Sequence, residues 1–311
     1  MKKILVTGGS GFIGTALIKK LLTLNYKVVI IDIKPSSLCH HNLTYIKGNI
    51  AIDASYKALN LYGLEIVIHL AAQTSARVSH EEIELNNSSN TLGTLKLIEW
   101  AKANKIKRFL FASSMAVYGD AQSNSLVETD DLLPNSYYGI SKLAGELALK
   151  LAASSGINTT ILRLFNVYGP GQDLENLKQG MVSIYLKFLL DNQIVKVTGS
   201  LDRYRDFIYI DDVVDAFTKV IENSKTYRQD YNVGSGRKTT VRELIKVLAK
   251  GFGYGSEPLP IEQVESHDGD VFGSLSNCNK LQDDTGWQIE WSLESGINEM
   301  INWAKKSRSK L

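Results

Sequence analysis

Residues 3–14 read KILVTGGSGFIG, and this stretch decides the fold. The apolar run at 3–7 predicts a short buried strand, and the glycines that follow predict a tight turn into a helix. Glycines at such a turn let a pyrophosphate approach the backbone, and the start of the helix offers it free N–H groups. We therefore interpret the stretch as a dinucleotide-binding site, with candidate contacts at Gly8, Gly11, Phe12, Ile13 and Gly14.

A carboxylate follows the second apolar run at the place where such a site holds a ribose. Asp32 comes directly after residues 27–31 (KVVII), 18 positions beyond Gly14. The spacing expected for a ribose-binding acid is about 20 residues. A carboxylate there accepts hydrogen bonds from ribose hydroxyls and repels a 2′-phosphate, and the nearest cation is Lys34. The sequence therefore favours NAD over NADP as the cofactor.

The first half of the chain alternates apolar runs with stretches of helical periodicity. Further apolar runs lie at 65–70, 108–113 and 158–164, and helical spacing marks 12–24, 91–103 and 138–154. Continuous Val/Ile/Leu runs suit strands that are buried on both faces, so the pattern predicts a Rossmann-type, doubly wound parallel α/β sheet. Near Tyr168 the elements become shorter and mixed. We predict an NAD-binding domain at 1–168 and a smaller mixed α/β substrate domain at 169–311, and leave open whether the chain interleaves between them.

Composition excludes several classes of protein. The 311 residues carry 35 Lys+Arg and 33 Asp+Glu, a net charge of +2, which provides no electrostatic footprint for nucleic acid. No apolar run approaches the ~18 residues of a membrane span. Cys39 and Cys278 are too far apart in sequence for a disulfide framework or a zinc spacing. We expect a cytoplasmic protein with no metal site and no nucleic-acid or membrane partner.

Three side chains are candidates for acid–base chemistry. Tyr138 and Lys142 stand four residues apart at the start of a predicted helix, so both lie on one helical face. A lysine there could lower the pKa of the phenol and make it a usable base. Ser114 follows a predicted strand at the sheet edge where open α/β sheets bind ligands.

These motifs occur in an order that resembles a known family. They are residues 8–14, Ser114 with 117–119 (VYG), 138–142 (YGISK), 162–169 (LRLFNVYG) and 205–212 (RDFIYIDD). Together they resemble the extended short-chain dehydrogenases, specifically the NAD-dependent nucleotide-sugar epimerases and dehydratases, and run through most of the chain. Within that family the pattern is most similar to UDP-glucose and UDP-N-acetylglucosamine 4-epimerases.

The resemblance implies an isomerase that inverts C4 of a nucleotide sugar. Dehydratases of the family carry Thr-Asp-Glu before Val-Tyr-Gly, whereas this chain has Ser114-Met115-Ala116, and Met and Ala cannot transfer protons. The implied reaction takes a UDP-hexose through a transient 4-keto sugar. Tyr138 is the implied base, assisted by Ser114 and Lys142.

Further contacts are carried over from the family motifs. The resemblance implies cofactor contacts at Asn49, Ile50, Leu70, Ala71, Ala72, Asn90, Tyr138, Lys142 and Phe165, with Asn90 supporting either the active-site backbone or the cofactor. It implies substrate contacts at Ser114, Asn166, Arg205, Asp270 and Ser274, with Arg205 pairing with the diphosphate.

Two positions differ from the family pattern, and a third bears on the size of the sugar. Asn49 stands where the family often has Asp, and His267 stands where it commonly has a phosphate-binding Arg. Ser274 stands where glucose-restricted epimerases have a bulky Tyr. A serine leaves room for a 2-acetamido group, so we expect N-acetylated sugars to be accepted, alongside or instead of glucose and galactose.

Two other functions and the choice of nucleotide remain open. A 4-keto-sugar reductase or dehydrogenase on the same scaffold would consume or produce NAD(P)H. A non-catalytic NAD(H)-binding protein would ordinarily lack the Tyr138–Lys142 pair. The family expectation is polysaccharide precursor synthesis by a homodimer, with helices 91–103 and 138–154 at its interface.

Overall fold

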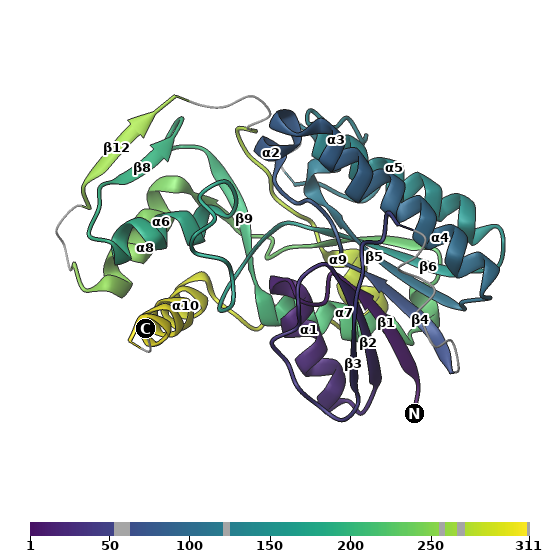
Figure 1. The fold of residues 1–311 in the computed structure, drawn as a ribbon. Helices are drawn as coiled ribbons and strands as arrows, with labels where there is room; N and C mark the ends of the chain where they lie inside the picture. Colours follow the sequence, from purple (N-terminus) through teal and green to yellow (C-terminus); the bar gives the residue numbers. More distant parts are fainter. Residues whose placement is uncertain (53–62, 121–124, 255–258, 266–270, 310–311) are drawn as a thin grey trace.

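The computed structural model describes residues 1–52, 63–120, 125–254, 259–265 and 271–309. Within these residues a seven-stranded parallel sheet, called here the large sheet, forms the centre of the molecule (Figure 1). Its strands in spatial order are β10 (Gln229–Val233), β6 (Asn158–Leu164), β5 (Arg108–Ser114), β4 (Leu64–His69), β1 (Lys3–Thr7), β2 (Lys27–Asp32) and β3 (Leu43–Lys47). The sheet confirms the predicted Rossmann-type fold class.

Helices cover both faces of the large sheet, which explains the continuous apolar runs of its strands. On β1, Ile4 and Val6 belong to one hydrophobic cluster and Leu5 to the other. The first cluster includes residues of α1 (Phe12–Thr23) and α7 (Ile210–Ile221), and the second includes residues of α4 (Gly93–Ala103) and α5 (Tyr137–Ala153). Two short helices, α2 (Ala76–Glu81) and α3 (Ile83–Asn86), lead through a π-helical turn into α4. A strand with no polar face is therefore buried on both sides.

The strand order reverses between β1 and β4. From β1 the chain proceeds to β2 and β3 on one side, and β4 then pairs with the other edge of β1. In an open parallel sheet the carboxyl ends of the strands at such a reversal form the ligand crevice. Gly8 lies at this point with φ +70°, and a Cβ on it would stand 2.6 Å from the amide nitrogen of Ala71.

A smaller group of elements lies to one side of the large sheet (Figure 1). It contains a three-stranded sheet of β11 (Lys238–Thr240), β9 (Tyr204–Tyr209) and β7 (Asn166–Tyr168), and a pair formed by β12 (Ile261–Val264) and β8 (Val195–Thr198). The helices of this half are α6 (Met181–Leu190), α8 (Val241–Phe252) and α10 (Leu293–Arg308), while α9 (Asn279–Thr285) contacts β10.

The chain returns to the large sheet after entering the smaller group. β10 pairs with β6, and α7 packs against α1. The buried guanidinium of Arg108 on β5 donates hydrogen bonds to the carbonyls of Val220 (2.7 Å) and Ile221 (3.0 Å) and to Oγ1 of Thr226 (3.0 Å). The boundary at residue 168 stays a prediction. No helix among the described residues is both long and apolar enough to cross a membrane.

Candidate active site

A cavity of about 770 Å³ opens at the carboxyl ends of β1, β4 and β5. Its volume is in the range of pockets that hold cofactors and small ligands, roughly 300–1,000 Å³. The lining includes most of the predicted cofactor contacts: Gly8, Gly11, Phe12, Ile13, Gly14, Asp32, Asn49, Ile50, Leu70, Ala71, Ala72, Tyr138, Lys142 and Phe165. Residues from the first 165 positions thus converge on one site.

The glycine turn has the close approaches that a dinucleotide needs. A Cβ on Gly14 would stand 2.3 Å from the carbonyl oxygen of Gly8, so a larger residue there would force the turn open. Helix α1 begins at Phe12, and its N-cap, Gly11, makes no side-chain capping bond. The first N–H groups of α1 are therefore available to an anion, as phosphate binding requires.

Asp32 presents its carboxylate to the same cavity. Oδ2 accepts a hydrogen bond from the amide of Ser10 (2.9 Å), and Oδ1 accepts one from the amide of Lys34 (2.9 Å). Each carboxylate oxygen can accept a second bond, so both retain capacity for the two ribose hydroxyls. These contacts orient Asp32 and fit the predicted role.

The three acid–base candidates line the same cavity as the glycine turn. Ser114 is the last residue of β5, and its Oγ accepts a hydrogen bond from the amide of Ala116 (3.2 Å). Tyr138 lies in the first turn of α5. Lys142 donates from Nζ to the carbonyl of Ala112 (2.9 Å), and its Nζ lies 5.8 Å from the centre of the Tyr138 ring. All three line the cavity.

Burial and neighbouring groups shift the pKa values of Tyr138 and Lys142. Burial raises the pKa of Tyr138 to about 12, and a hydrogen bond with Ser114 acts in the opposite direction. Burial lowers the pKa of Lys142 to about 8, and the charge of Glu146 raises it. A phenol with so high a pKa becomes a base only when a positive charge lies beside it. Lys142 can supply that charge while it stays protonated.

The predicted substrate contacts divide into two groups. Asn166 lines the cavity and donates from Nδ2 to the carbonyl of Asp206 (3.1 Å). Arg205 and Ser274 are buried outside the cavity lining. Nη1 of Arg205 donates to the carbonyls of Tyr204 (2.8 Å) and Phe272 (3.3 Å), and Oγ of Ser274 has no hydrogen-bond partner among the described residues. Their substrate contacts stay predictions, and Asp270, like His267, lies outside the described residues.

Asn90 lies behind the cavity wall rather than on it. Its Nδ2 donates to the carbonyl of Gln73 (2.8 Å) and to Oγ of Ser141 (3.0 Å), and its Oδ1 accepts from the amide of Gln73 (2.8 Å). The side chain is 2% exposed. The sequence left open whether Asn90 supports the active-site backbone or contacts the cofactor. These contacts favour the first role, because they join the backbone that follows β4 to α5.

The sequence did not indicate that the loop before α6 lines the cavity. Gln172, Gln179 and Thr74 all line it. Oγ1 of Thr74 donates to Oε1 of Gln179 (2.7 Å), and Oγ of Ser75 donates to the carbonyl of Lys178 (2.9 Å). The loop before α6 is thereby joined to the loop after β4. The sequence could have indicated Thr74 and Ser75 by their position, because residues 73–75 directly follow Ala71 and Ala72, which were predicted to contact the cofactor.

Comparison with known proteins identifies the family. The model of the NAD dependent epimerase/dehydratase family matches residues 4–234. The putative UDP-glucose 4-epimerase of Methanocaldococcus jannaschii is 33% identical over 309 residues, which cover 98% of this chain and 99% of that protein.

Solved structures agree over almost the whole chain. The UDP-glucose 4-epimerase of Thermotoga maritima with UDP-glucose superposes with a TM-score of 0.91 at 32% identity, covering 98% of this chain and 99% of that one. The UDP-N-acetylglucosamine 4-epimerase of Methanobrevibacter ruminantium in complex with UDP-N-acetylmuramic acid has a TM-score of 0.88 at 29% identity, with the same coverage. This chain therefore belongs to the NAD dependent epimerase/dehydratase family and is an NAD-dependent epimerase of the extended short-chain dehydrogenase type.

Proposed function

We propose that the protein inverts C4 of a UDP-hexose, and that its substrates include UDP-N-acetylhexosamines. The observation that supports this most directly is the convergence of Ser114, Tyr138 and Lys142 with the glycine turn on one cavity. The names of the relatives support the choice of UDP and of C4.

In this proposal the side chains of the cavity transfer a single proton to and from the sugar. Bound NAD supplies a hydride acceptor that can return the hydride. Tyr138 removes the proton from the sugar O4 and later gives it back. Ser114 donates a hydrogen bond to the same oxygen, and the positive charge of Lys142 stabilises the phenolate. The glycine turn and Asp32 hold the dinucleotide in place, so that orientation contributes to the rate.

The transient ketone must turn in the cavity before it is reduced on its other face. The 4-keto sugar therefore needs room that a tightly packed site would not leave. The loop that carries Gln172 and Gln179 lines this space and is joined to Thr74 and Ser75 by the two hydrogen bonds described above. We expect this joined pair of loops to retain the sugar while it turns.

The sugar preference rests on Ser274. Ser274 is buried outside the cavity lining, at the position where the resemblance places a bulky Tyr in glucose-restricted epimerases, and we expect the smaller side chain to leave room for a 2-acetamido group. Its buried Oγ has no partner among the described residues, so it retains a donor and an acceptor for a polar group nearby. Acceptance of an N-acetylated sugar is the expected result.

Proton NMR of the anomeric region tests both proposals. The purified protein is incubated, without added cofactor, with UDP-N-acetylglucosamine and separately with UDP-glucose. Appearance of the galacto anomer supports 4-epimerase activity with retained NAD, and the faster substrate decides the argument about Ser274. Turnover of UDP-glucose alone contradicts acceptance of N-acetylated sugars. No reaction without cofactor, but oxidation of added NADH by a 4-keto sugar, would instead support a net reductase.

We also propose that the protein is a homodimer. α5 exposes Ile140, Leu147 and Leu151, which recur at helical spacing on one face, and the neighbouring α4 exposes Leu95. Leu151 is 73% exposed. Clustered large apolar side chains on the surface mark interaction sites. A second copy that contributes the same two helices would cover them.

A further inference from the structure

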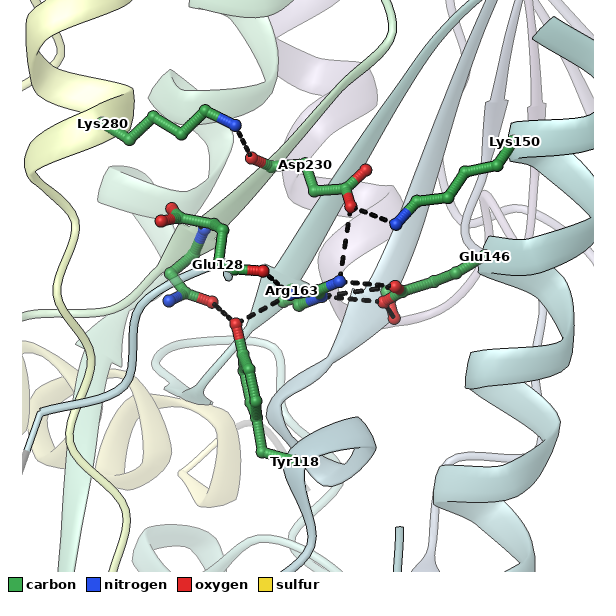
Figure 2. A network of polar contacts seen from close by, with 9 residues as sticks. Tyr118, Glu128, Glu146, Lys150, Arg163, Asp230 and Lys280 are labelled. Atoms are coloured by element: carbon green, nitrogen blue, oxygen red, sulfur yellow. Dashed lines mark hydrogen bonds and ion pairs between the residues drawn. The ribbon is translucent and has the colours of Figure 1, made fainter. Parts of the chain in front are cut away.

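A buried ion pair lies one helical turn behind the proposed catalytic lysine. Tyr138, Lys142 and Glu146 follow one another at intervals of four on α5, so all three share a face of the helix. Glu146 is fully buried, and Arg163 of β6 is 1% exposed. The guanidinium engages both carboxylate oxygens, with Nη2 at 2.8 Å from Oε2 and Nε at 3.0 Å from Oε1 (Figure 2).

The pair is connected to the strand end that carries Ser114. Ser113, the residue before Ser114, donates from Oγ to Oε1 of Glu146 at 2.5 Å. On the other side of Ser114, the hydroxyl of Tyr118 accepts a hydrogen bond from Nη1 of Arg163 at 2.9 Å (Figure 2). Ser114 therefore lies between two segments that the ion pair holds.

The same face of α5 is connected to β5 by Lys142. Its Nζ donates to the carbonyl of Ala112, so successive residues 112 and 113 bind successive turns of α5. Ser114 comes next and faces the cavity. A shift of Glu146 would move the strand end relative to Tyr138, and small displacements of reacting groups cost large factors in rate.

Stability alone does not account for a charge at this place. Replacing a buried ion pair by apolar side chains of similar volume is often neutral or stabilising, because desolvation offsets the attraction between the charges. Lys142 is buried as well, and burial disfavours its cationic form. The carboxylate of Glu146 acts against that loss. Its charge thus serves the group that the proposed reaction needs as a cation.

We propose that Glu146 is a positioning residue for the reaction: through Ser113 it fixes the end of β5 that carries Ser114, and it places a carboxylate one helical turn from Lys142 on the same face of α5. This inference rests on the proposed function, because it assigns a purpose to the charge of Lys142. Glu146 itself does not line the cavity and acts through Ser113 and Lys142.

An NMR titration of Lys142 is influenced by the charged and titratable groups around it. On its own helix these are Tyr138 and Glu146, and from β4 His69 faces it, with a pKa that burial lowers to about 3. β5 contributes the Phe111 ring, 5.0 Å from Nζ, and the carbonyl of Ala112, and β6 contributes Arg163 beyond Glu146. We expect Lys142, whose pKa burial lowers to about 8, to titrate between pH 6 and 10, and substituting Tyr138 by Phe removes the phenol beside it.

The decisive measurement is the titration of Lys142 by NMR. NAD-loaded Tyr138→Phe protein is labelled with ¹³C at the lysine Cε, and the Lys142 signal is assigned by its loss in a Lys142→Met variant. Adding Glu146→Gln should lower the titration midpoint by about one pH unit, the lower end of the effect of a nearby opposite charge. An unchanged midpoint would overturn the proposal. The readout needs no substrate, so it is independent of whether the proposed function holds.

Asp230→Asn is the matched control. Asp230 is a carboxylate of the same network, 3.4 Å from Nη2 of Arg163 and 2.5 Å from Nζ of Lys150 (Figure 2). It lies on β10, whereas the charge that raises the pKa of Lys142 belongs to Glu146. Removal of the Asp230 charge should leave the Lys142 midpoint in place. An equal shift in both variants would show a general effect of net charge and would refute a specific role of Glu146.

Two further variants separate folding from positioning. Glu146→Gln leaves the buried guanidinium of Arg163 without the negative charge of its partner, which could destabilise the fold. The double variant Glu146→Gln, Arg163→Gln therefore removes both charges. The Lys142 midpoint should fall in it too. Ser113→Ala keeps the ion pair but breaks the bond to β5. In otherwise wild-type protein it should lower kcat about tenfold with KM unchanged. An unaltered kcat would contradict the positioning of Ser114 through Ser113.

Discussion

Replacing Gly8 by alanine should damage the cofactor site by a calculable amount. Gly8 has φ +70°, and the added Cβ would lie 2.6 Å from the amide nitrogen of Ala71, whereas ordinary contact begins at 3.4 Å. Positive φ costs an alanine about 1–2 kcal/mol. Separating the ends of β1 and β4 by about 0.8 Å adds an overpacking cost of about 1–3 kcal/mol. The expected total is about 2–5 kcal/mol of unfolding free energy.

Gly286→Ala isolates the backbone part of this cost. Gly286 has φ +68°, but a Cβ on it would meet nothing within 4 Å. Urea unfolding should therefore place Gly8→Ala about 1–3 kcal/mol below Gly286→Ala. Because the strain of Gly8→Ala falls in the cavity, its NAD affinity should fall at least tenfold, equivalent to about 1.4 kcal/mol, while Gly286→Ala binds normally. Equal stabilities and equal NAD binding in the two variants would refute the close-approach argument.

Three other predictions follow from the site and the surface. Tyr138→Phe should abolish turnover while NAD stays bound, because the proton acceptor is lost and the cofactor cradle is intact; near-normal turnover would show that another group is the base. Since burial lowers the pKa of Lys142 to about 8, kcat should decline as the pH rises through that value, and a profile that stays level to pH 10 would contradict its role. Leu151→Glu should shift the mass measured by light scattering from dimer to monomer, whereas Ile194→Glu, at an exposed site away from α5, should not; a wild-type monomer would rule the dimer out.

The large sheet could be predicted where its strands carry continuous apolar runs. Residues 3–7 and 158–164 form β1 and β6 with the predicted bounds, because strands buried on both faces require such runs. β10 was missed. Its sequence, QDYNV, has no continuous apolar run, and its buried Asn232 is satisfied by contacts with Tyr118 and with the backbone of Leu126. Such partners come from distant parts of the chain and leave no local signal.

In the candidate site, too, the features with a local sequence signal could be predicted, and those that depend on distant residues could not. The spacing of Tyr138 and Lys142 placed both on one face of a helix, and the structure brings them to the cavity. The same spacing extends to Glu146, but a glutamate on a helix ordinarily suggests a solvated face. Its burial depends on Arg163, which arrives from another strand. Arg205 lies outside the cavity lining because its orientation depends on the carbonyls of two neighbouring segments.

The return of β10 to the large sheet has a consequence for synthesis on the ribosome. After residue 168, the chain must grow by a further 65 residues, 169–233, before β10 can pair with β6 and before Arg108 meets its acceptors at Val220, Ile221 and Thr226. At about 5–20 residues per second this takes roughly 3–13 s. During that interval the outer edge of β6 carries unpaired backbone groups that another strand could occupy. The outer edge of β6 is therefore open to wrong strand pairing in the nascent chain until β10 takes its place.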